Sequence, residues 1–345
     1  MNVFFYNLNV GSGIEKIGDT ILDMLSGYDV IEYKMQNPAC ILIDELAKAK
    51  PDVIIINEFY PRLIHVAYFY KALFPETKVV LINHTLNVLR SLPLNVDGKR
   101  HFENVSKDGE VLINYAFRNK IDHVINLNWY PYDVGLPDWL ESKTTHILFP
   151  VRDTEFNITV PFNDREKDFL YFGNMLPHKL SLEFLKALAE TDMMLDIYGK
   201  MFDRPELKEY NEVIEKSPNI NYLGFCPSDK VQETMNNYRF FVSARDGHEP
   251  FMTVMAEVIM SGMIPLVAND RTKRGSEWID HYVGCYLEYQ STAELLKAMK
   301  HYLRKKKDHQ FIATLTKRSA ANSAEMTERT SCEQFKKTLL EIVST

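Results

Sequence analysis

Short runs of apolar and β-branched residues recur through the first 130 residues of the chain, and amphipathic stretches separate most of them. The runs have the length of strands, whereas the stretches between them have the period of helices. Alternation of this kind predicts a parallel sheet covered by helices. The expected strands are Asn2–Leu8, Asp29–Tyr33, Asp52–Asn57, Lys78–Asn83 and His123–Leu127.

The same alternation resumes at Asp168 and lasts to about residue 290, after which residues 292–344 have a largely helical pattern. Between the two regions lies Asn157–Lys167, a polar stretch that we interpret as a surface connection. A length of 345 residues is also more than one hydrophobic core ordinarily supports, and it suits two domains. We therefore predict an α/β protein of two domains, with a boundary near residue 155.

Composition and charge narrow the class of protein. The chain is 46% hydrophobic and 25% charged, which is typical of a soluble globular protein. Its net charge of −7 argues mildly against a polyanion as the main partner. Residues 304–307, Arg-Lys-Lys-Lys, form a local basic patch, for which a solvated helical face is the plainer interpretation.

The cysteines and the amino terminus suggest a compartment. Cys40, Cys226, Cys285 and Cys332 are scattered without the paired spacing of metal sites or disulfide scaffolds, so reduced thiols are expected. The amino terminus lacks the pattern of a signal peptide, and no apolar run approaches the roughly 20 residues of a membrane span. We expect a cytoplasmic protein, or one of the host cytoplasm if a phage encodes it.

The most informative stretch is Phe240–Asp270, which predicts a strand, a loop, a helix and a second strand. Phe240–Val242 end the first strand, and the polar residues 243–248 open into the helix. From Met252 the run is mostly apolar, until Ser261-Gly262 stop the helix ahead of the next strand.

Two carboxylates, Glu249 and Glu257, are eight residues apart across this junction. At roughly 100° per residue, that spacing brings the two side chains within about 80° of one another, so both can face one cleft. The amides of residues 251–254 lie near a positive helix end and favour a phosphate. The pattern suits a ligand linked to a nucleotide.

This arrangement resembles the donor-binding signature of GT-B glycosyltransferases, most closely the retaining family 4 (glycosyl transferases group 1) type. Residues 168–179, DFLYFGNMLPHK, resemble the strand and loop that open the C-terminal domain of that family. Further matches cover most of residues 145–300, at 195–200, 221–225 and 264–277. The resemblance implies two Rossmann-like domains with a cleft between them: an acceptor-side domain at 1–155, a nucleotide-sugar domain at 156–330, and a helix at 331–345 that packs back on the first.

The resemblance also implies roles at the donor site. Glu257 would bind the ribose hydroxyls, Glu249 would contact the sugar, and Lys179 would stabilise the departing diphosphate. Gly173 stands at the family's glycine position, whereas Asn174 replaces the usual arginine, so Arg245, Lys200 or Arg274 would have to supply that charge. Met252 replaces a glycine and would reshape the sugar pocket. The other donor-binding residues expected are His248, Phe251 and Thr253.

Candidates for the acceptor side come from the first domain. Gly11 and Gly13 follow the first strand, where a tight turn lets backbone approach a ligand, although a lone Gly-x-Gly is a weak signal. His84 lies at a strand end, similar in position to the acceptor-side histidine of the family and placed as ligand sites are in open α/β sheets. Trp129 could form a platform for a sugar or base, or pack at a domain interface. Asn57 and Glu58 are weaker candidates.

The implied activity is transfer of a sugar from a nucleotide donor, expected to be a UDP-sugar, to an acceptor hydroxyl, with retention of anomeric configuration. Neither a metal nor a cofactor is expected beyond the nucleotide-sugar as co-substrate. The acceptor could be a glycan, a small molecule or a hydroxymethylated pyrimidine in phage DNA, whose base would have to be flipped out. Two alternatives stay open: a GT-B-shaped sugar-nucleotide epimerase, and a non-catalytic module that binds a carbohydrate or a partner.

Overall fold

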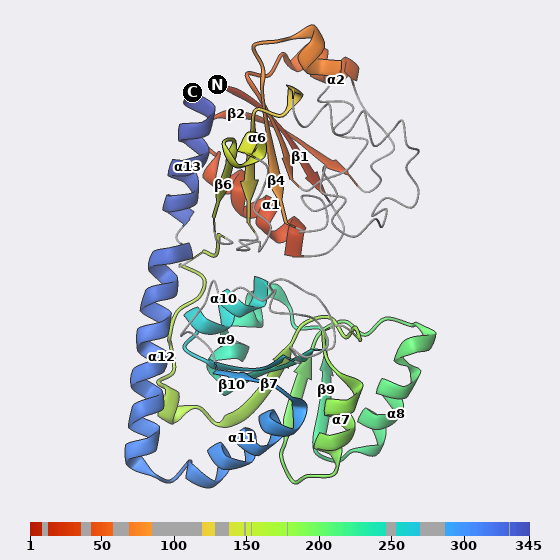
Figure 1. Cartoon of the computed structure of the whole chain (residues 1–345), viewed down its shortest axis with the longest axis vertical. Helices are drawn as coiled ribbons and strands as arrows, with labels where there is room; N and C mark the ends of the chain where they lie inside the picture. Colours follow the sequence, from red (N-terminus) through yellow and green to blue (C-terminus); the bar gives the residue numbers. More distant parts are fainter. Residues whose placement is uncertain are drawn as a thin grey trace. The chain divides into compact units, whose positions relative to one another are not determined.

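The chain folds into two compact units in a computed structural model (Figure 1). The first unit comprises Met1–Val151 and Thr330–Thr345, and the second comprises Arg152–Arg329. The structure describes residues 1–8, 13–35, 43–57, 69–84, 119–127, 138–147, 150–152, 154–177, 179–245, 253–269, 287–330 and 332–345.

The first unit is built on a parallel sheet with the strand order β2-β1-β3-β4-β5-β6. The strands are β1 (Asn2–Leu8), β2 (Asp29–Met35), β3 (Val53–Asn57), β4 (Lys78–Asn83), β5 (His123–Asn126) and β6 (Thr144–His146). All five predicted strands are therefore confirmed. The short strand β6, Thr-Thr-His, was not predicted because it contains no apolar run.

Helices cover this sheet, and its central strands are consequently buried on both faces. All five residues of β3 are buried, which explains its continuous apolar sequence Val-Ile-Ile-Ile. The described helices of this unit are α1 (Gly13–Met24), α2 (Ile43–Ala49), α6 (Asp138–Glu141) and α13 (Cys332–Ser344). The last of these contacts α1 and buries Phe335 and Leu339, so the C-terminal helix is part of the first unit.

The second unit contains a parallel sheet with the order β12-β11-β10-β7-β8-β9. Its strands are β7 (Lys167–Phe172), β8 (Leu195–Tyr198), β9 (Ile220–Gly224), β10 (Tyr238–Arg245), β11 (Ile264–Asn269) and β12 (Leu287–Tyr289). From β7 the chain first adds strands on one side, and from β10 it adds them on the other. The order thus reverses between β7 and β10, as in doubly wound nucleotide-binding folds. Two parallel sheets with covering helices confirm the predicted α/β class.

Six helices of the second unit are described: α7 (Leu182–Ala189), α8 (Lys208–Lys216), α9 (Val231–Asn236), α10 (Thr253–Met260), α11 (Thr292–Lys305) and α12 (His309–Thr330). Residues from α7, α8 and α11 join one hydrophobic core with alternate residues of the strands, such as Phe240, Val242 and Ala244 on β10. This period of two is expected where one face of a strand meets one helix layer.

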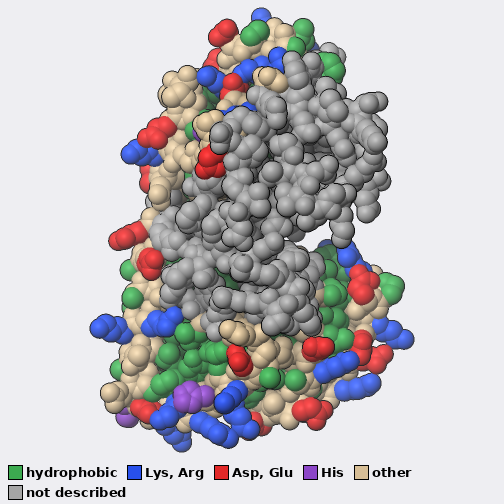
Figure 2. Space-filling view, in the orientation of Figure 1, with side chains coloured by type: hydrophobic (Ala, Val, Ile, Leu, Met, Phe, Trp, Pro, Cys, Tyr) green, Lys and Arg blue, Asp and Glu red, His purple; other side chains and the backbone are tan. Residues whose placement is uncertain are grey.

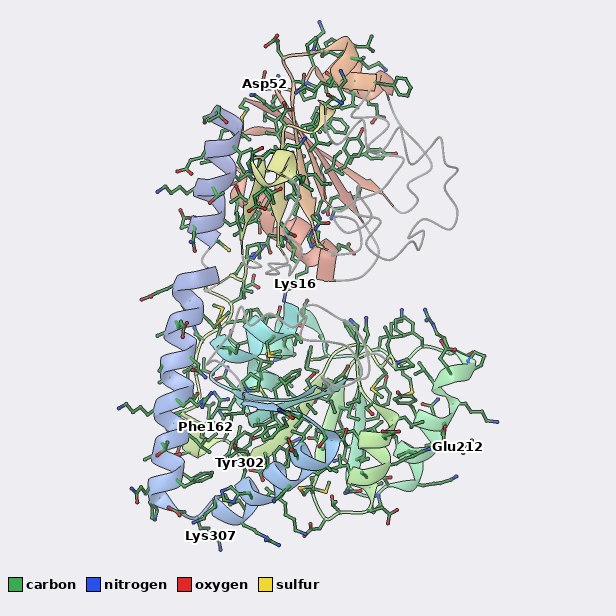
Figure 3. The ribbon with its side chains drawn as sticks, in the orientation of Figure 1. Lys16, Asp52, Phe162, Glu212, Tyr302 and Lys307 are labelled. Carbon is green, nitrogen blue, oxygen red and sulfur yellow. The ribbon has the colours of Figure 1, made fainter. Side chains whose placement is uncertain are left out.

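Aromatic packing seats α11 on that sheet. The Tyr302 ring stacks on Phe240 with centroids 5.0 Å apart, and Phe162 meets Phe240 edge-on at 5.6 Å. Figure 3 shows Phe162 and Tyr302 on the inner side of the helices in the second unit. Phe311 on α12 stacks on Tyr302 in turn, at 5.7 Å. The predicted helical character of residues 292–344 is confirmed by α11, α12 and α13.

The interpretation of Asn157–Lys167 as a surface connection holds for most of the stretch, since eight of its eleven residues are exposed, with Phe162 and Arg165 as the buried exceptions. Phe162 and Arg165 in this stretch are only 2% and 1% exposed. The Arg165 guanidinium donates hydrogen bonds to the carbonyl oxygens of Val160 (3.2 Å), Tyr238 (2.7 Å) and Ser261. Two buried side chains therefore anchor this exposed stretch to the second unit, and its arginine joins the start of β10 to the end of α10.

The end of α10 follows the prediction. Gly262 has a φ of +74°, its N–H donates to the carbonyl of Ile259, and the N–H of Met263 donates to the carbonyl of Val258. This is the glycine-terminated helix end known as the Schellman motif. A side chain in place of Gly262 would collide with Ile158 and approach the Arg165 guanidinium, so the glycine is also required for packing.

The basic patch at the end of α11 is partly neutralised. Lys305 pairs with Asp308 at 2.9 Å, and Lys306 approaches Asp168 at 3.5 Å. Figure 2 shows Lys and Arg side chains interspersed with acidic ones on this part of the second unit. Among the described helices, none combines the length and apolar character needed to cross a membrane.

Candidate functional site

The reversal of strand order in the second unit lies between β7 and β10, and ligands of open α/β sheets bind beyond the carboxyl ends of strands at such a point. Gly173 directly follows β7, and the loop after it leads into α7. The N–H of Ser181 donates to the carbonyl of Ala244 at 2.7 Å, which ties the end of this loop to the end of β10. A backbone hydrogen bond therefore joins the start of α7 to the end of β10.

Glycines allow the loops after β7 and β8 to lie against each other. Gly173 and Gly199 have φ angles of +155° and +154°. A Cβ on Gly199 would lie 1.8 Å from the carbonyl oxygen of Gly173, so no other residue fits there without moving backbone. The N–H of Gly173 donates to the carbonyl of Tyr198 (2.9 Å), and that of Met175 donates to the carbonyl of Lys200 (3.0 Å). The sequence indicated Gly173 and missed Gly199, whose partner lies far away in the chain.

Asn174 and Lys179 lie on this same loop. The Tyr171 hydroxyl donates to the carbonyl of Asn174 at 3.0 Å, which fixes the backbone next to Gly173. The N–H of Lys179 donates to the carbonyl of Leu176, so Lys179 closes a turn just before the N-cap of α7, Ser181. Its half-buried side chain thus starts beside the positive end of a helix, where an anion is favoured.

Glu257 lies on α10, the helix that connects β10 to β11. It is only 7% exposed, and its neighbours Ala256 and Val258 are completely buried. A carboxylate buried in such an apolar segment requires polar partners, as the sequence had led us to expect. The described candidates therefore lie on three segments that follow β7 or β10: the glycine loop after β7, the turn that leads into α7, and α10.

Several predicted site residues lie outside the described part of the chain. These are His248, Glu249, Phe251, Met252, Gly11 and Trp129, together with Arg274. The side chains of Arg245 and Thr253 are likewise not described, although their backbones are, at the end of β10 and the start of α10. Lys200 is exposed, and its ammonium group lies 5.2 Å from the centroid of the Phe202 ring.

In the first unit, His84 follows β4 and is buried. Its Nε2 lies 2.7 Å from Oδ1 of Asn57, which ends β3. Burial lowers the pKa of His84 to about 3, so the imidazole is neutral at physiological pH. Gly13, expected in a loop, is the first residue of α1. The structure thus joins His84 to Asn57, which the sequence had indicated only weakly.

Asparagines lie at or next to the ends of four neighbouring strands, at Asn7, Asn57, Asn83 and Asn126, which are all at most 2% exposed. Only Asn57 among them was a candidate from the sequence. Asn57 donates to Asn7 Oδ1 at 3.1 Å, and Asn83 donates to Asn126 Oδ1 at 2.9 Å. Each follows an apolar run, in FFYN, IIIN, VLIN and HVIN. That recurrence at strand ends was the signal that could have revealed them.

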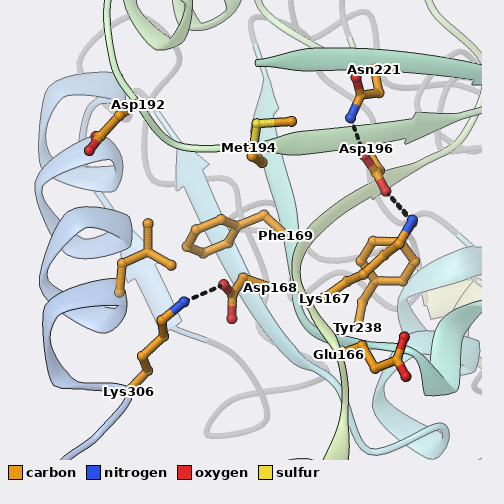
Figure 4. A pocket seen from close by; sticks show the side chains of 11 residues that line it. Glu166, Lys167, Asp168, Phe169, Asp192, Met194, Asp196, Asn221, Tyr238 and Lys306 are labelled. Carbon is orange, nitrogen blue, oxygen red and sulfur yellow. Dashed lines mark hydrogen bonds and ion pairs between the residues drawn. The ribbon is translucent and has the colours of Figure 1, made fainter. Parts of the chain in front are cut away.

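A pocket of about 390 Å³ in the second unit lies at the opposite edge of the sheet, beside the amino ends of β7, β8 and β10 (Figure 4). Several of its polar groups pair with one another. Asp196 accepts hydrogen bonds from Lys167 (2.7 Å), Tyr238 (2.6 Å) and Asn221 (2.8 Å). Burial raises the pKa of Asp196, but these three hydrogen bonds outweigh it and hold the pKa below its ordinary value. We interpret this network as a structural clamp on the sheet.

Across the described ranges, no three His, Cys, Asp or Glu side chains are grouped in a way that could hold a metal ion.

Comparison with known proteins gives two kinds of match. Residues 153–318, within the second unit, match the family model described as glycosyl transferases group 1. No curated protein sequence matches the chain.

Solved structures match over the entire chain. Anabaena Alr3699/HepE in complex with UDP and glucose superposes with a TM-score of 0.70 at 14% identity, covering 100% of this chain and 99% of that one. A glycosyltransferase from Rickettsia africae gives a TM-score of 0.64 at 13% identity, with 99% and 97% covered. AviGT4, a glycosyltransferase involved in avilamycin A biosynthesis, gives 0.58 at 14% identity, with 100% and 97% covered.

The predicted architecture is confirmed by these matches, since their fold is shared over the full length of the chain. The family match falls on the unit that contains the glycine loop, Lys179 and Glu257. The chain is therefore a glycosyltransferase of the GT-B fold, and residues 153–318 are its glycosyl transferases group 1 domain.

Proposed function

We propose that this glycosyltransferase takes a sugar from a UDP-sugar and transfers it, with retention of anomeric configuration and without a metal, to an acceptor hydroxyl. The observation that carries the proposal is the strand-order switch of the second unit, because the segments that follow β7 and β10 there carry Gly173, Lys179 and Glu257. Support for the nucleotide comes from Anabaena HepE, which is similar in fold and binds UDP and UDP-glucose.

Each donor-side residue has a physical reason for its role. The glycine pair lets backbone amides come close to the diphosphate, and Lys179 neutralises the charge that develops on it as the glycosidic bond breaks. Glu257 accepts hydrogen bonds from the ribose hydroxyls. Further residues would complete this site: Glu249 and His248 against the sugar, and Phe251, Met252, Thr253 and Arg245 around the rest of the donor. Asn174 occupies the place of the missing positive charge.

We place the acceptor on the first unit, next to His84, with Gly11, Gly13 and Trp129 as further candidates. The acceptor class is a glycan or a small molecule. The nucleotide-sugar would be the co-substrate, with no resident cofactor, and the cytoplasm, where nucleotide-sugars are made, would be the compartment. A hydroxymethylated base in DNA is the less favoured acceptor, since Lys305 and Lys306 already pair with aspartates.

The proposal is tested by measuring the turnover of UDP-glucose with and without an acceptor, and with and without EDTA. Without an acceptor, we expect the release of UDP to be slow, and we expect its rate to rise at least tenfold when a suitable sugar or small-molecule alcohol is added. EDTA should leave this rate unchanged, because Lys179 and helix-end amides replace a metal. The product should have the anomeric configuration of the donor.

Three outcomes would contradict the proposal. Consumption of UDP-glucose that needs no acceptor and yields a rearranged sugar would identify an epimerase. Binding without turnover across a broad acceptor panel would identify a non-catalytic module. Loss of turnover in EDTA, restored by Mg²⁺ or Mn²⁺, would overturn the metal-free mechanism.

A further inference from the structure

A chain of buried amides leads from His84 to acidic side chains of the first unit. His84 Nε2 lies 2.7 Å from Asn57 Oδ1, and Asn57 Nδ2 lies 3.1 Å from Asn7 Oδ1. Asn7 Nδ2 in turn lies 2.9 Å from Glu32 Oε1 and 3.3 Å from Asp19 Oδ1. A series of hydrogen bonds through two asparagines therefore links His84 to two carboxylates.

The register of the strands explains this alignment. Tyr6 pairs with Ile56, so the next residues, Asn7 and Asn57, lie side by side, and Asn57 itself pairs with Ile82. Because side chains alternate between faces, His84 points to the same face as Ile82 and Asn57. The helix on that face is α1: a Cβ on its Gly18 would lie 2.0 Å from Asn7 Oδ1 and 2.6 Å from Asn57 Nδ2.

The two carboxylates decide which group donates and which accepts in each of these hydrogen bonds. An ionised carboxylate only accepts hydrogen bonds, so Asn7 must turn its NH₂ group toward Glu32 and Asp19 and its oxygen toward Asn57. Asn57 must then donate its NH₂ to that oxygen, which leaves its own oxygen facing His84. Reversing the amides would set oxygen against oxygen at Glu32 and would forfeit a hydrogen bond to a charged group.

We propose that Asn57 and Asn7 are positioning residues that hold His84 in the Nε2–H form, so that its Nδ1 accepts a hydrogen bond from the hydroxyl of the acceptor substrate. The inference rests on the proposed function for the acceptor side of His84. It assigns the chemistry of the group that His84 meets: that group is a hydrogen-bond donor, such as an alcohol, and not a phosphate or carbonyl oxygen.

The protonation of the His84 imidazole is consistent with this role. Burial holds His84 neutral, so it carries one proton, and the Asn57 oxygen takes that proton's hydrogen bond at Nε2. Ring tautomers are set in this way by the partner of one nitrogen, which decides what the other nitrogen can do.

Nitrogen NMR of the full-length protein with ¹⁵N-labelled histidine tests the inference. The His84 signals are identified by their loss in His84→Gln. We expect the wild type to show a protonated Nε2 and an unprotonated Nδ1, and Asn57→Leu to show both tautomers. In Asn57→Leu we also expect kcat for UDP release from UDP-glucose to fall about tenfold or more, the scale on which loss of a positioning partner acts. The affinity for UDP should stay within about twofold.

Two further variants keep the test decisive. Asn126→Leu removes the buried asparagine that pairs with Asn83, and should leave the His84 tautomer and kcat unchanged. Asn57→Asp retains an oxygen for His84 in a side chain of the same shape, so it should keep Nε2–H even if Asn57→Leu does not fold. A protonated Nδ1 in the wild type, or an unchanged tautomer in Asn57→Leu, would overturn the inference. So would loss of the tautomer with an unchanged kcat. Failure of UDP to bind the wild type would instead count against the proposed function.

Discussion

Replacing Lys179 by alanine is expected to lower kcat for sugar transfer at least a hundredfold, with little effect on folding. Lys179 closes the turn before the N-cap of α7, so its positive charge and the helix end act together on one anion. The departing diphosphate gains charge in the transition state, and removal of one such stabilising group typically costs about 10²–10³ in kcat. Steady-state release of UDP from the donor measures this effect.

Two companion variants make the Lys179 result specific. Lys179→Arg keeps the positive charge and should restore part of the rate. Lys186→Ala removes another lysine of the same loop–helix segment, an exposed side chain on α7 that pairs with Glu209, and should leave kcat unchanged. A wild-type kcat in Lys179→Ala, or an equal loss in Lys186→Ala, would remove Lys179 from the mechanism.

Replacing Arg165 by methionine should destabilise the second unit by about 3 kcal/mol or more. Burial lowers the pKa of Arg165 to about 10, and the nearby Arg239 adds to this, yet the guanidinium remains charged at neutral pH. Methionine fills much of the space but donates nothing, so the carbonyls of Val160, Tyr238 and Ser261 lose their partner. A buried polar group without a partner costs about 1–3 kcal/mol, and three are affected here.

Thermal unfolding measures this loss of stability. For a unit of this size, each kcal/mol corresponds to about 2–4 °C, so we expect Tm of the second unit to fall by roughly 10 °C. Arg204→Met is the matched control, because the Arg204 side chain is 53% exposed and its change should stay within about 0.5 kcal/mol. A Tm that does not fall in Arg165→Met would show that the arginine does not hold the start of β10 to the end of α10.

The parts of the fold that follow from local sequence were predictable. A short apolar run rich in β-branched residues, such as VVLIN, favours a strand buried on both faces, and Ser-Gly after the apolar run of α10 ends the helix as observed. Arg165 was not predictable, because charged residues are rarely buried, and two of the three carbonyls that make its burial tolerable come from distant segments. Gly199 was missed for the same reason: its constraint is the carbonyl of Gly173, in another strand's loop.

The residues of the candidate site likewise divide into those that the sequence could indicate and those that it could not. Gly173, Lys179 and Glu257 were found through resemblance, since spacing along the chain carries that signal. The pairing of His84 with Asn57 depends on the register between β3 and β4, which no local pattern specifies. The four strand-end asparagines were visible as a repeat, but their division into pairs on opposite faces required the sheet order.

Calorimetric titration with UDP, GDP and ADP tests the central claim, that the second unit holds the donor nucleotide against Glu257. We expect selective binding of UDP, weakened by about 1–3 kcal/mol in Glu257→Ala and less in Glu257→Gln, the scale for hydrogen bonds lost at a buried carboxylate. Asp196→Asn is the control: Asp196 is also 7% exposed, but lies at the opposite edge of the sheet, so UDP affinity should not change. Absence of nucleotide binding at millimolar concentration, or equal affinity in the wild type and Glu257→Ala, would contradict the account.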